Sequence, residues 1–241
     1  MGEQIHVGGK EQTTFLAEKL KLDKINYKKQ ILDICSALGG PARQLVQDYN
    51  VKVLGLDITP KMIEEAKNRT KDIKYAEKIE YRLGSGLDIP SHKETFDIVW
   101  GQDAWCYIRD KPRLIQEIYR VLKPGGKLGF TDWIWGTRDP PENEADYLME
   151  FMVFPDLETI DGYCDLIQSK GLNNIEHDDL GPDFARYMDV YLNILRENAK
   201  PIIDNFGESL YLEAEKGVVA WNQAAKENWV SRGFWIAEKP D

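Results

Sequence analysis

A glycine-rich turn followed by an acid is the most informative chemical pattern in this sequence. An apolar run at 31–34 ends in small residues and the pair Gly39 and Gly40, after which a helical pattern begins. Small residues let the backbone approach a ligand closely, and the free amide groups of the new helix point at that ligand. About twenty residues beyond the turn, a second apolar run ends at Asp57, and a carboxylate at that offset is the usual partner of a ribose diol. The pattern predicts half of a site for a nucleoside cofactor.

Further polar side chains are expected at the same place in the fold. The runs 79–83, 96–100 and 127–132 are typical of strands, and turns or helical segments separate them. Strands that alternate with helices form a parallel sheet with right-handed crossovers, and its ligands bind at the carboxyl ends of the strands. The side chains that fall at those ends are Asp57, Ser85, Gln102, Asp103, Asp132 and Trp133.

The elements that position these residues follow from periodicity and turn signals. We expect strands at 30–34, 51–56, 79–83, 96–100, 127–132, 174–178 and 229–238. We expect helices at 10–21, after Gly40, after Pro60, after Pro112, and at 144–154, 159–170, 182–205 and 209–228. Thr59 is expected to cap the helix that begins at Pro60, and the stretch 123–126 (Lys-Pro-Gly-Gly) to separate helix from strand.

The length of 241 residues suits one α/β domain with a modest insertion. We expect an N-terminal lid or cap at 1–28, a cofactor-binding core at 29–135, a helical insertion with strand six on the substrate side at 136–228, and a final strand at 229–241. The helix at 10–21 has two interpretations: it folds over the site as a lid, or it packs on the edge of the sheet.

Composition narrows the class of protein. A formal net charge of −10 disfavours a protein that binds nucleic acid, because such binding depends on a basic surface. No apolar run reaches the roughly twenty residues of a membrane span, and the start of the chain lacks the features of a signal peptide. The three cysteines and three histidines are scattered without metal-ligand spacing, which predicts no metal site, reduced thiols and a cytoplasmic location.

Four motifs together resemble those of class I S-adenosylmethionine-dependent methyltransferases. They are the turn at 32–40, the acid in 55–57, the strand at 96–100 and the stretch 121–126. More narrowly, 39–43, 102–104 and the pair at 8–9 resemble methyltransferases that act on glycine, sarcosine and dimethylglycine, and phosphoethanolamine and some sterol or tocopherol methyltransferases look similar. The resemblance implies a Rossmann-like seven-stranded sheet, mostly parallel with its last strand antiparallel, and S-adenosylmethionine lying across strands one to four.

The resemblance also assigns cofactor contacts to residues of this chain. The expected contacts are Cys35, Ala37, Gly39, Gly40, Asp57, Ile58, Ser85, Gly86, Leu87 and Gln102. Ile58 and Leu87 would enclose the adenine, and Gln102 would lie near the methionine end and the substrate. The chain departs from the family pattern at Cys35 and Ala37, where glycine is usual, and at Ser85, where an acid usually binds the adenine amine.

Methyl transfer from a sulfonium is an in-line displacement, so most of the rate can come from positioning. A neutral amine acceptor needs no obligatory base, whereas a hydroxyl or carbon nucleophile requires one. The candidate bases are His6, Asp103 and Tyr107. The candidate substrate contacts are Trp105, Trp133, Arg43 and Tyr187. Aromatic faces near acids can hold an ammonium group, although core and lid packing uses the same residue types.

We therefore expect an S-adenosylmethionine-dependent methyltransferase whose substrate is a small polar metabolite. The acceptor atom is expected to be an amine nitrogen, as in glycine, sarcosine or dimethylglycine, and the product of the cofactor is S-adenosylhomocysteine. One alternative is methylation of oxygen, carbon or sulfur in another small molecule. A second alternative, suggested by Cys35, Ala37 and Ser85, is a non-catalytic protein that binds S-adenosylmethionine or S-adenosylhomocysteine.

Overall fold

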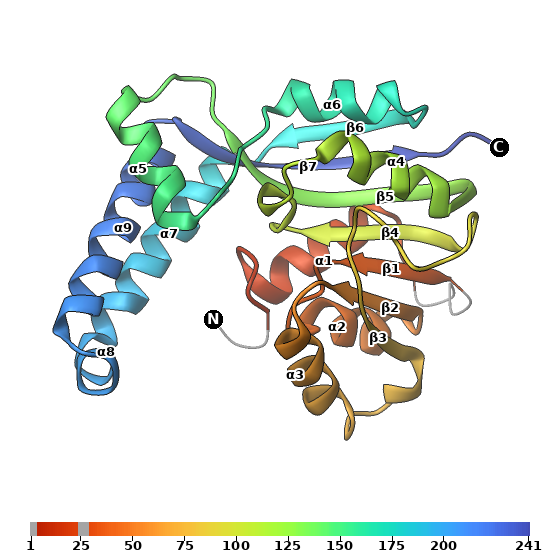
Figure 1. Ribbon diagram of the computed structural model, residues 1–241, viewed down its shortest axis with the longest axis horizontal. Coiled ribbons are helices and arrows are strands. Elements are labelled where there is room, and N and C mark those ends of the chain that lie inside the picture. The colour runs from red at the N-terminus through yellow and green to blue at the C-terminus, as the bar shows by residue number, and fades with distance from the viewer. Residues whose placement is uncertain (1–3, 24–28) are drawn as a thin grey trace.

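A seven-stranded sheet with the order β3-β2-β1-β4-β5-β7-β6 forms the centre of the computed structural model (Figure 1). The structure describes residues 4–23 and 29–241, so parts of the expected segment 1–28 lie outside the described residues. The strands are β1 (Gln30–Ile34), β2 (Lys52–Asp57), β3 (Ile79–Leu83), β4 (Phe96–Gln102), β5 (Leu122–Trp135), β6 (Asn173–Asp179) and β7 (Val230–Glu238). Strands β1 to β5 pair in parallel, and β7 runs antiparallel to β5 and β6. The predicted sheet with its antiparallel last strand is confirmed.

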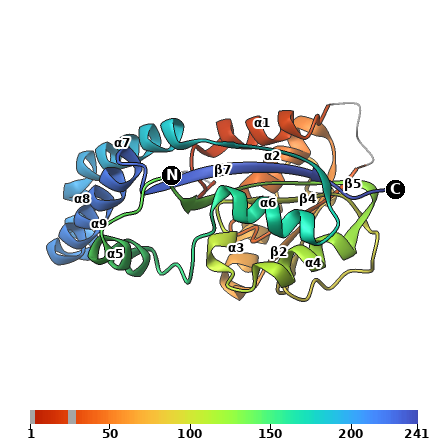
Figure 2. The same ribbon diagram turned by 90° about the horizontal axis from the view of Figure 1, so that it is seen from above.

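Helices cover both faces of this sheet. They are α1 (Gly9–Lys19), α2 (Gly40–Tyr49) and α3 (Pro60–Thr70) on one face, and α4 (Lys111–Val121) and α6 (Ile160–Ser169) on the other. Figure 2 shows α1 and α6 on opposite sides of β7. Successive strand residues point to opposite faces, so Ile31 packs with the first group of helices and Leu32 with the second. Both side chains are fully buried.

Helix α1 belongs to the core. Its residues Leu16 and Ala17, and Leu20 directly after it, are fully buried and share an apolar cluster with Ile31. The helix thus packs against the sheet, and the segment 4–8 in front of it is the part that reaches the strand ends. None of the helices formed by residues 4–23 and 29–241 is long and apolar enough to cross a membrane.

The remaining helices lie together beyond the carboxyl ends of the parallel strands (Figure 1). They are α5 (Glu142–Met152), α7 (Gly181–Glu197), α8 (Ala199–Phe206) and α9 (Glu208–Lys226). They enclose an apolar cluster of their own, which includes Leu148, Phe184 and Trp221. The expectation of one helix at 182–205 is wrong, because the helix breaks between Glu197 and Ala199. Pro201 lacks the N–H that a continuous helix would donate to the carbonyl of Glu197.

Two local expectations also need correction. The stretch 123–126 is part of β5, which begins at Leu122; the register shifts there, and Gly125 adopts a φ of 66°. Thr59 does stand at the N-cap of α3, but its hydroxyl makes no capping hydrogen bond. The carboxylate of Asp57 accepts from the Thr59 amide at 2.9 Å, so the acid at the end of β2 stabilises this helix start.

Candidate functional site

A cavity of about 170 Å³ lies where the turn after β1 meets the end of β4. Its lining includes these predicted site residues: His6, Cys35, Ala37, Gly40, Gln102, Asp103, Tyr107 and Trp133. It also includes residues that the sequence did not single out: Ile5, Val7, Asp33, Ser36, Met152 and Phe154. A larger hollow of about 860 Å³ lies near the amino-terminal ends of β1, β2 and β4. Since ligands of such sheets bind at the carboxyl ends, the smaller cavity is the better candidate.

The turn after β1 has a strained backbone. Cys35 and Ala37 adopt φ values of 62° and 45°, a region that costs a residue with a side chain roughly 1–2 kcal/mol. Gly39 has a φ of 73°, and a Cβ there would collide with the hydroxyl of Tyr81. The Ala37 amide donates to Asp57 Oδ2 at 2.9 Å, so the acid holds the turn in this conformation. Backbone strain of this kind is typical of a ligand site.

The ends of β2 and β3 continue the site beside the turn. Asp57 is 8% exposed, and each of its oxygens accepts one amide hydrogen bond and keeps a second lone pair. The next residue, Ile58, is 70% exposed, which is unusual for isoleucine. Across the strand pair, the Gly84 amide donates to the Asp57 carbonyl at 2.9 Å, and Ser85 Oγ accepts from the Leu87 amide at 3.1 Å. An exposed apolar side chain therefore stands next to a buried acid.

Three buried polar atoms of the cavity lining have no hydrogen-bond partner within the described chain. They are Asp33 Oδ2, Ser36 Oγ and Gln102 Nε2. Leaving such an atom unpaired costs about 1–3 kcal/mol, and since all three residues line one cavity, this points to a polar ligand there. Burial, with a further contribution from the charge of Asp57, raises the pKa of Asp33 to about 8. The signal for Asp33 in the sequence is an acid inside an otherwise apolar strand.

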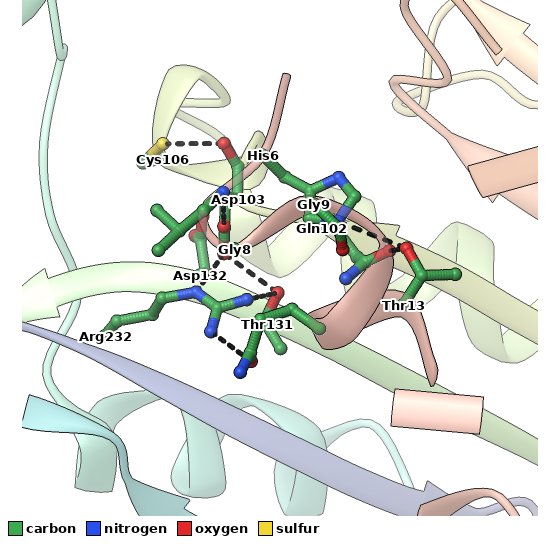
Figure 3. A network of polar contacts seen from close by, with 12 residues as sticks. His6, Gly8, Gly9, Thr13, Gln102, Asp103, Cys106, Thr131, Asp132 and Arg232 are labelled. Carbon is green, nitrogen blue, oxygen red and sulfur yellow. Dashed lines mark hydrogen bonds and ion pairs between the residues drawn. The ribbon is translucent and has the colours of Figure 1, made fainter. Parts of the chain in front are cut away.

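A chain of hydrogen bonds sets the direction of the Gln102 side chain (Figure 3). Its Oε1 accepts from Thr13 Oγ1 at 3.0 Å and from Trp100 Nε1 at 3.2 Å, which leaves the NH₂ group as the free end. His6 Nε2 lies 3.0 Å from the carbonyl oxygen of Gly9 and 3.2 Å from Thr13 Oγ1. A carbonyl only accepts, so we assign the proton to Nε2 and a free lone pair to Nδ1. Burial lowers the pKa of His6 to about 4, despite the opposing effect of Asp103.

The other two candidate bases are less suited to accept a proton. The Asp103 carboxylate accepts from the Val7 amide and Thr131 Oγ1, both at 2.8 Å, and pairs with Arg232 Nε at 2.7 Å. These contacts occupy both of its oxygens (Figure 3). Tyr107 is half exposed, and burial raises its pKa to about 12, so its hydroxyl stays protonated at neutral pH.

The four candidate substrate residues do not converge. Trp133 lines the cavity and contacts Phe154, with a ring distance of 5.6 Å. Trp105 is 1% exposed and stacks on Phe130 at 4.3 Å, which places it in the core under the sheet. Its side chain is held there by packing, so Trp105 does not reach the cavity.

Arg43 and Tyr187 also lie outside the cavity lining. Arg43 is buried, and its guanidinium donates to the carbonyl oxygen of Leu38 at 2.7 Å. The hydroxyl of Tyr187 donates to Glu11 Oε2 at 2.9 Å, and its ring belongs to the apolar cluster of the outer helices. Both side chains support elements around the site.

The segment before α1 covers the cavity. Val7 and its neighbours line it, and the Val7 amide is bound to Asp103. The Gly8 amide donates to the hydroxyl of Tyr191 on α7 at 2.9 Å. Gly8 has a φ of 70°, and a Cβ there would lie 2.7 Å from the Tyr187 ring, so a larger residue would push the segment away from α7.

A comparison of the sequence with known protein families gives a result that agrees with this geometry. Residues 32–130 match the family described as a methyltransferase domain. The matched region extends from β1 to β5 and contains the turn, Asp57 and Gln102.

The similarity to curated proteins and solved structures extends beyond this domain to nearly the whole chain. It is 29% identical over 97% of its length to glycine/sarcosine/dimethylglycine N-methyltransferase from Actinopolyspora halophila, of which it covers 43%. It is 26% identical over 98% of its length to phosphoethanolamine N-methyltransferase 1 from Triticum aestivum, of which it covers 46%. The chain thus spans less than half the length of these curated relatives.

The same fold is found in a structure of phosphoethanolamine N-methyltransferase 2 from Haemonchus contortus, in complex with phosphomonomethylethanolamine and S-adenosylhomocysteine. The TM-score is 0.89 at 23% identity, and the alignment covers 99% of this chain and 55% of that one. The similarity therefore includes the outer helices and the N-terminal segment of this chain as well as the sheet.

Proposed function

We propose that this protein transfers a methyl group from S-adenosylmethionine to the nitrogen of a small polar amine. The observation that carries the proposal is the set of unpaired polar atoms around the cavity, within a domain that matches methyltransferases. The names of the two curated relatives, both N-methyltransferases of small amines, support the same activity and acceptor atom.

The residues at the strand ends suit the parts of this cofactor. Asp33 offers an unpaired carboxylate oxygen to the ammonium group, and the Gln102 NH₂ group and the amides at the start of α2 offer donors to the carboxylate. Asp57 keeps lone pairs for the ribose hydroxyls, and the exposed Ile58 and the partly buried Leu87 offer apolar surface to the adenine. Ser85 keeps its hydroxyl proton as a donor, since its oxygen accepts from Leu87.

The protein contributes positioning to the chemical step. Bound S-adenosylmethionine supplies a methyl group on a sulfonium, which a neutral amine can attack directly. The segment before α1 lines the cavity and would limit the access of water to the bound substrates. Of the three candidate bases, His6 presents a free lone pair on a buried, neutral ring, so it is suited to accept a hydrogen bond from the amine N–H and to orient the amine, while the pKa of about 4 keeps the ring unprotonated.

Calorimetry and a transfer assay test this proposal. S-adenosylmethionine and S-adenosylhomocysteine are each titrated into the protein, and transfer of a labelled methyl group is then followed over amines, thiols and phenols. Binding with transfer to amines supports the proposal. Transfer only to thiols or phenols supports sulfur or oxygen as the acceptor atom. Binding without any transfer supports a non-catalytic binding protein. Absence of binding refutes the proposal and both of these alternatives.

We also propose a cytoplasmic location. The described chain contains Cys35, Cys106 and Cys164 as free thiols, as expected in a reducing compartment. Alkylation of the purified, denatured protein without reductant should modify Cys35, Cys106 and Cys164, because all three are expected to be free thiols. Recovery of a disulfide-linked form from cells would contradict this location.

A further inference from the structure

The residues that line the cavity fall into two groups of different chemical character, a polar side near the turn and an apolar group. Asp33, Ser36 and Gln102 come from β1, the turn and β4, and they carry the unpaired polar atoms. Six other lining residues, here called the acceptor wall, come from the segment before α1, the stretch after β4, the end of β5 and the end of α5; they are Ile5, Val7, Tyr107, Trp133, Met152 and Phe154. If the cofactor occupies the polar side, as proposed above, the methyl acceptor must lie against the acceptor wall.

The acceptor wall is apolar and aromatic. The rings of Tyr107 and Phe154 are 4.9 Å apart in an edge-on arrangement, and Trp133 contacts Phe154 at 5.6 Å. Two acids, Asp33 and Asp103, line the same cavity. Aromatic faces together with carboxylates favour a cationic or neutral amine, because the ring faces carry partial negative charge.

No lysine or arginine lines the cavity within the residues that the structure describes. Three buried cations, Arg43, Lys111 and Arg232, stand on neighbouring elements, and all have partners; Arg43 donates to the carbonyl oxygen of Leu38, as described above. Arg232 donates to Asp103, to Gln12 Oε1 at 2.7 Å and to Thr131 Oγ1 at 2.9 Å. Lys111 Nζ donates to two backbone carbonyl oxygens, at 3.2 and 3.3 Å. His6, the remaining basic residue of the lining, is a neutral donor to Gly9.

An anionic acceptor would therefore lose its hydration without gaining a counter-ion. Burying an unpaired carboxylate or phosphate is strongly unfavourable, because the lining offers no cation to replace its hydration. The acceptors in the names of the two relatives do carry an anionic group. Glycine bears a carboxylate, and phosphoethanolamine bears a phosphate. The shared fold therefore does not imply a shared acceptor.

We propose that the methyl acceptor of this protein is a small amine without a carboxylate or phosphate group, selected by the acceptor wall and by the absence of a cation in it. This inference rests on the proposed function, since it needs the cofactor on the polar side of the cavity. It assigns to Tyr107, Trp133 and Phe154 the role of holding the amine, and to Met152 a position where a cation would change specificity.

Calorimetry on the complex with S-adenosylhomocysteine tests the inference with matched pairs of amines. The pairs are glycinamide and glycine, sarcosinamide and sarcosine, and ethanolamine and phosphoethanolamine. We expect the member without an anionic group to bind at least tenfold more tightly in each pair. Equal or tighter binding of the anionic members, or binding of neither member of any pair, would overturn the inference.

A charge introduced into the acceptor wall gives a second test. Met152→Lys should raise the affinity for glycine and phosphoethanolamine at least tenfold relative to their uncharged partners. Val153→Lys is the matched control, because Val153 is the neighbouring residue, is 76% exposed and does not line the cavity. An equal gain in both variants would show a general charge effect and would overturn the role of the wall.

The two proposals fail in different ways. Absence of S-adenosylhomocysteine binding refutes the proposed function itself, whereas binding of S-adenosylhomocysteine with a preference for anionic amines refutes only the specificity. The cofactor titration is therefore done first, on the same protein preparation.

Discussion

Arg232 Nε and Asp103 Oδ1 lie 2.7 Å apart, and both side chains are 1% exposed. The pair joins the last strand of the chain to the residue that follows β4. Asp103 also accepts from the Val7 amide, so the pair connects the sheet to the segment that covers the cavity. This buried ion pair thus connects β7 and the end of β4 to the segment that covers the cavity.

Breaking this pair should destabilise the protein strongly. Arg232→Met leaves the Asp103 carboxylate buried without its counter-ion, which is expected to cost about 3–5 kcal/mol in the free energy of unfolding. The double variant Arg232→Met, Asp103→Asn should recover part of this loss, because the unpaired charge is gone. Denaturant unfolding measures both, and Arg138→Met serves as control, since its ion pair with Glu227 is exposed and is expected to contribute less than about 1 kcal/mol.

Asp57 should contribute to cofactor affinity. Asp57→Ala removes the acceptor proposed for the ribose hydroxyls, and each such charge-assisted hydrogen bond is worth about 1.5–3 kcal/mol, or roughly 10- to 150-fold in affinity. Asp57→Asn keeps an acceptor oxygen and should lose less. Calorimetry with S-adenosylhomocysteine compares both with Glu64→Ala, an exposed acid of α3. Unchanged affinity in Asp57→Ala would place the ribose elsewhere.

Asp33 should make stability fall as pH rises. Its pKa is about 8 in the folded protein against 3.8 as the ordinary value, so the folded state keeps a proton that the unfolded state loses between pH 4 and 8. The free energy of unfolding should therefore decrease over that range. Asp33→Asn should flatten this decrease and raise the melting temperature at pH 8 more than at pH 5.

The same substitution should weaken cofactor binding, because the carboxylate partner of the ammonium group is lost. Calorimetry with S-adenosylhomocysteine on Asp33→Asn measures this. A variant that is more stable and equally tight in binding would contradict the role given to Asp33.

His6 should act in the opposite pH direction. Its pKa of about 4 in the folded protein lies below the ordinary 6.5, so between these values only the unfolded state takes up the proton. Stability should be complete above pH 6.5 and fall by about 3 kcal/mol as pH decreases to 4. His6→Gln should reduce this dependence, whereas His92→Gln, on an exposed loop, should leave it unchanged. Melting curves from pH 4 to 7 provide the measurement.

Relief of the backbone strain in the turn after β1 should increase the free energy of unfolding. Ala37 has a φ of 45°, so Ala37→Gly relieves a left-handed backbone and should raise the free energy of unfolding by about 1 kcal/mol. Ala214→Gly, within helix α9, should lower it by about the same amount, because glycine weakens a helix interior. A loss of stability in Ala37→Gly would mean that the turn is not strained.

Local sequence patterns were sufficient to predict most of the helices and strands. The bounds of β1 and β3 agree with the strands expected at 30–34 and 79–83, because a strand is encoded by a few consecutive residues between turn signals. The break between α7 and α8 was missed, although Pro201 is the local signal for it. The turn, Asp57 and Gln102 were found together because they occupy fixed places at successive strand ends.

What the sequence determined by itself was the α/β sheet and the sheet edge at which the polar side chains gather, since hydrophobic periodicity and small-residue turns act over short distances. Only the tertiary structure decided which side chains face the cavity. Asp103 and Arg232 are 129 residues apart, and their pairing depends on the register of β5 with β7. Trp105 and Trp133 are both aromatic residues near strand ends, yet packing buries one in the core and turns the other to the cavity.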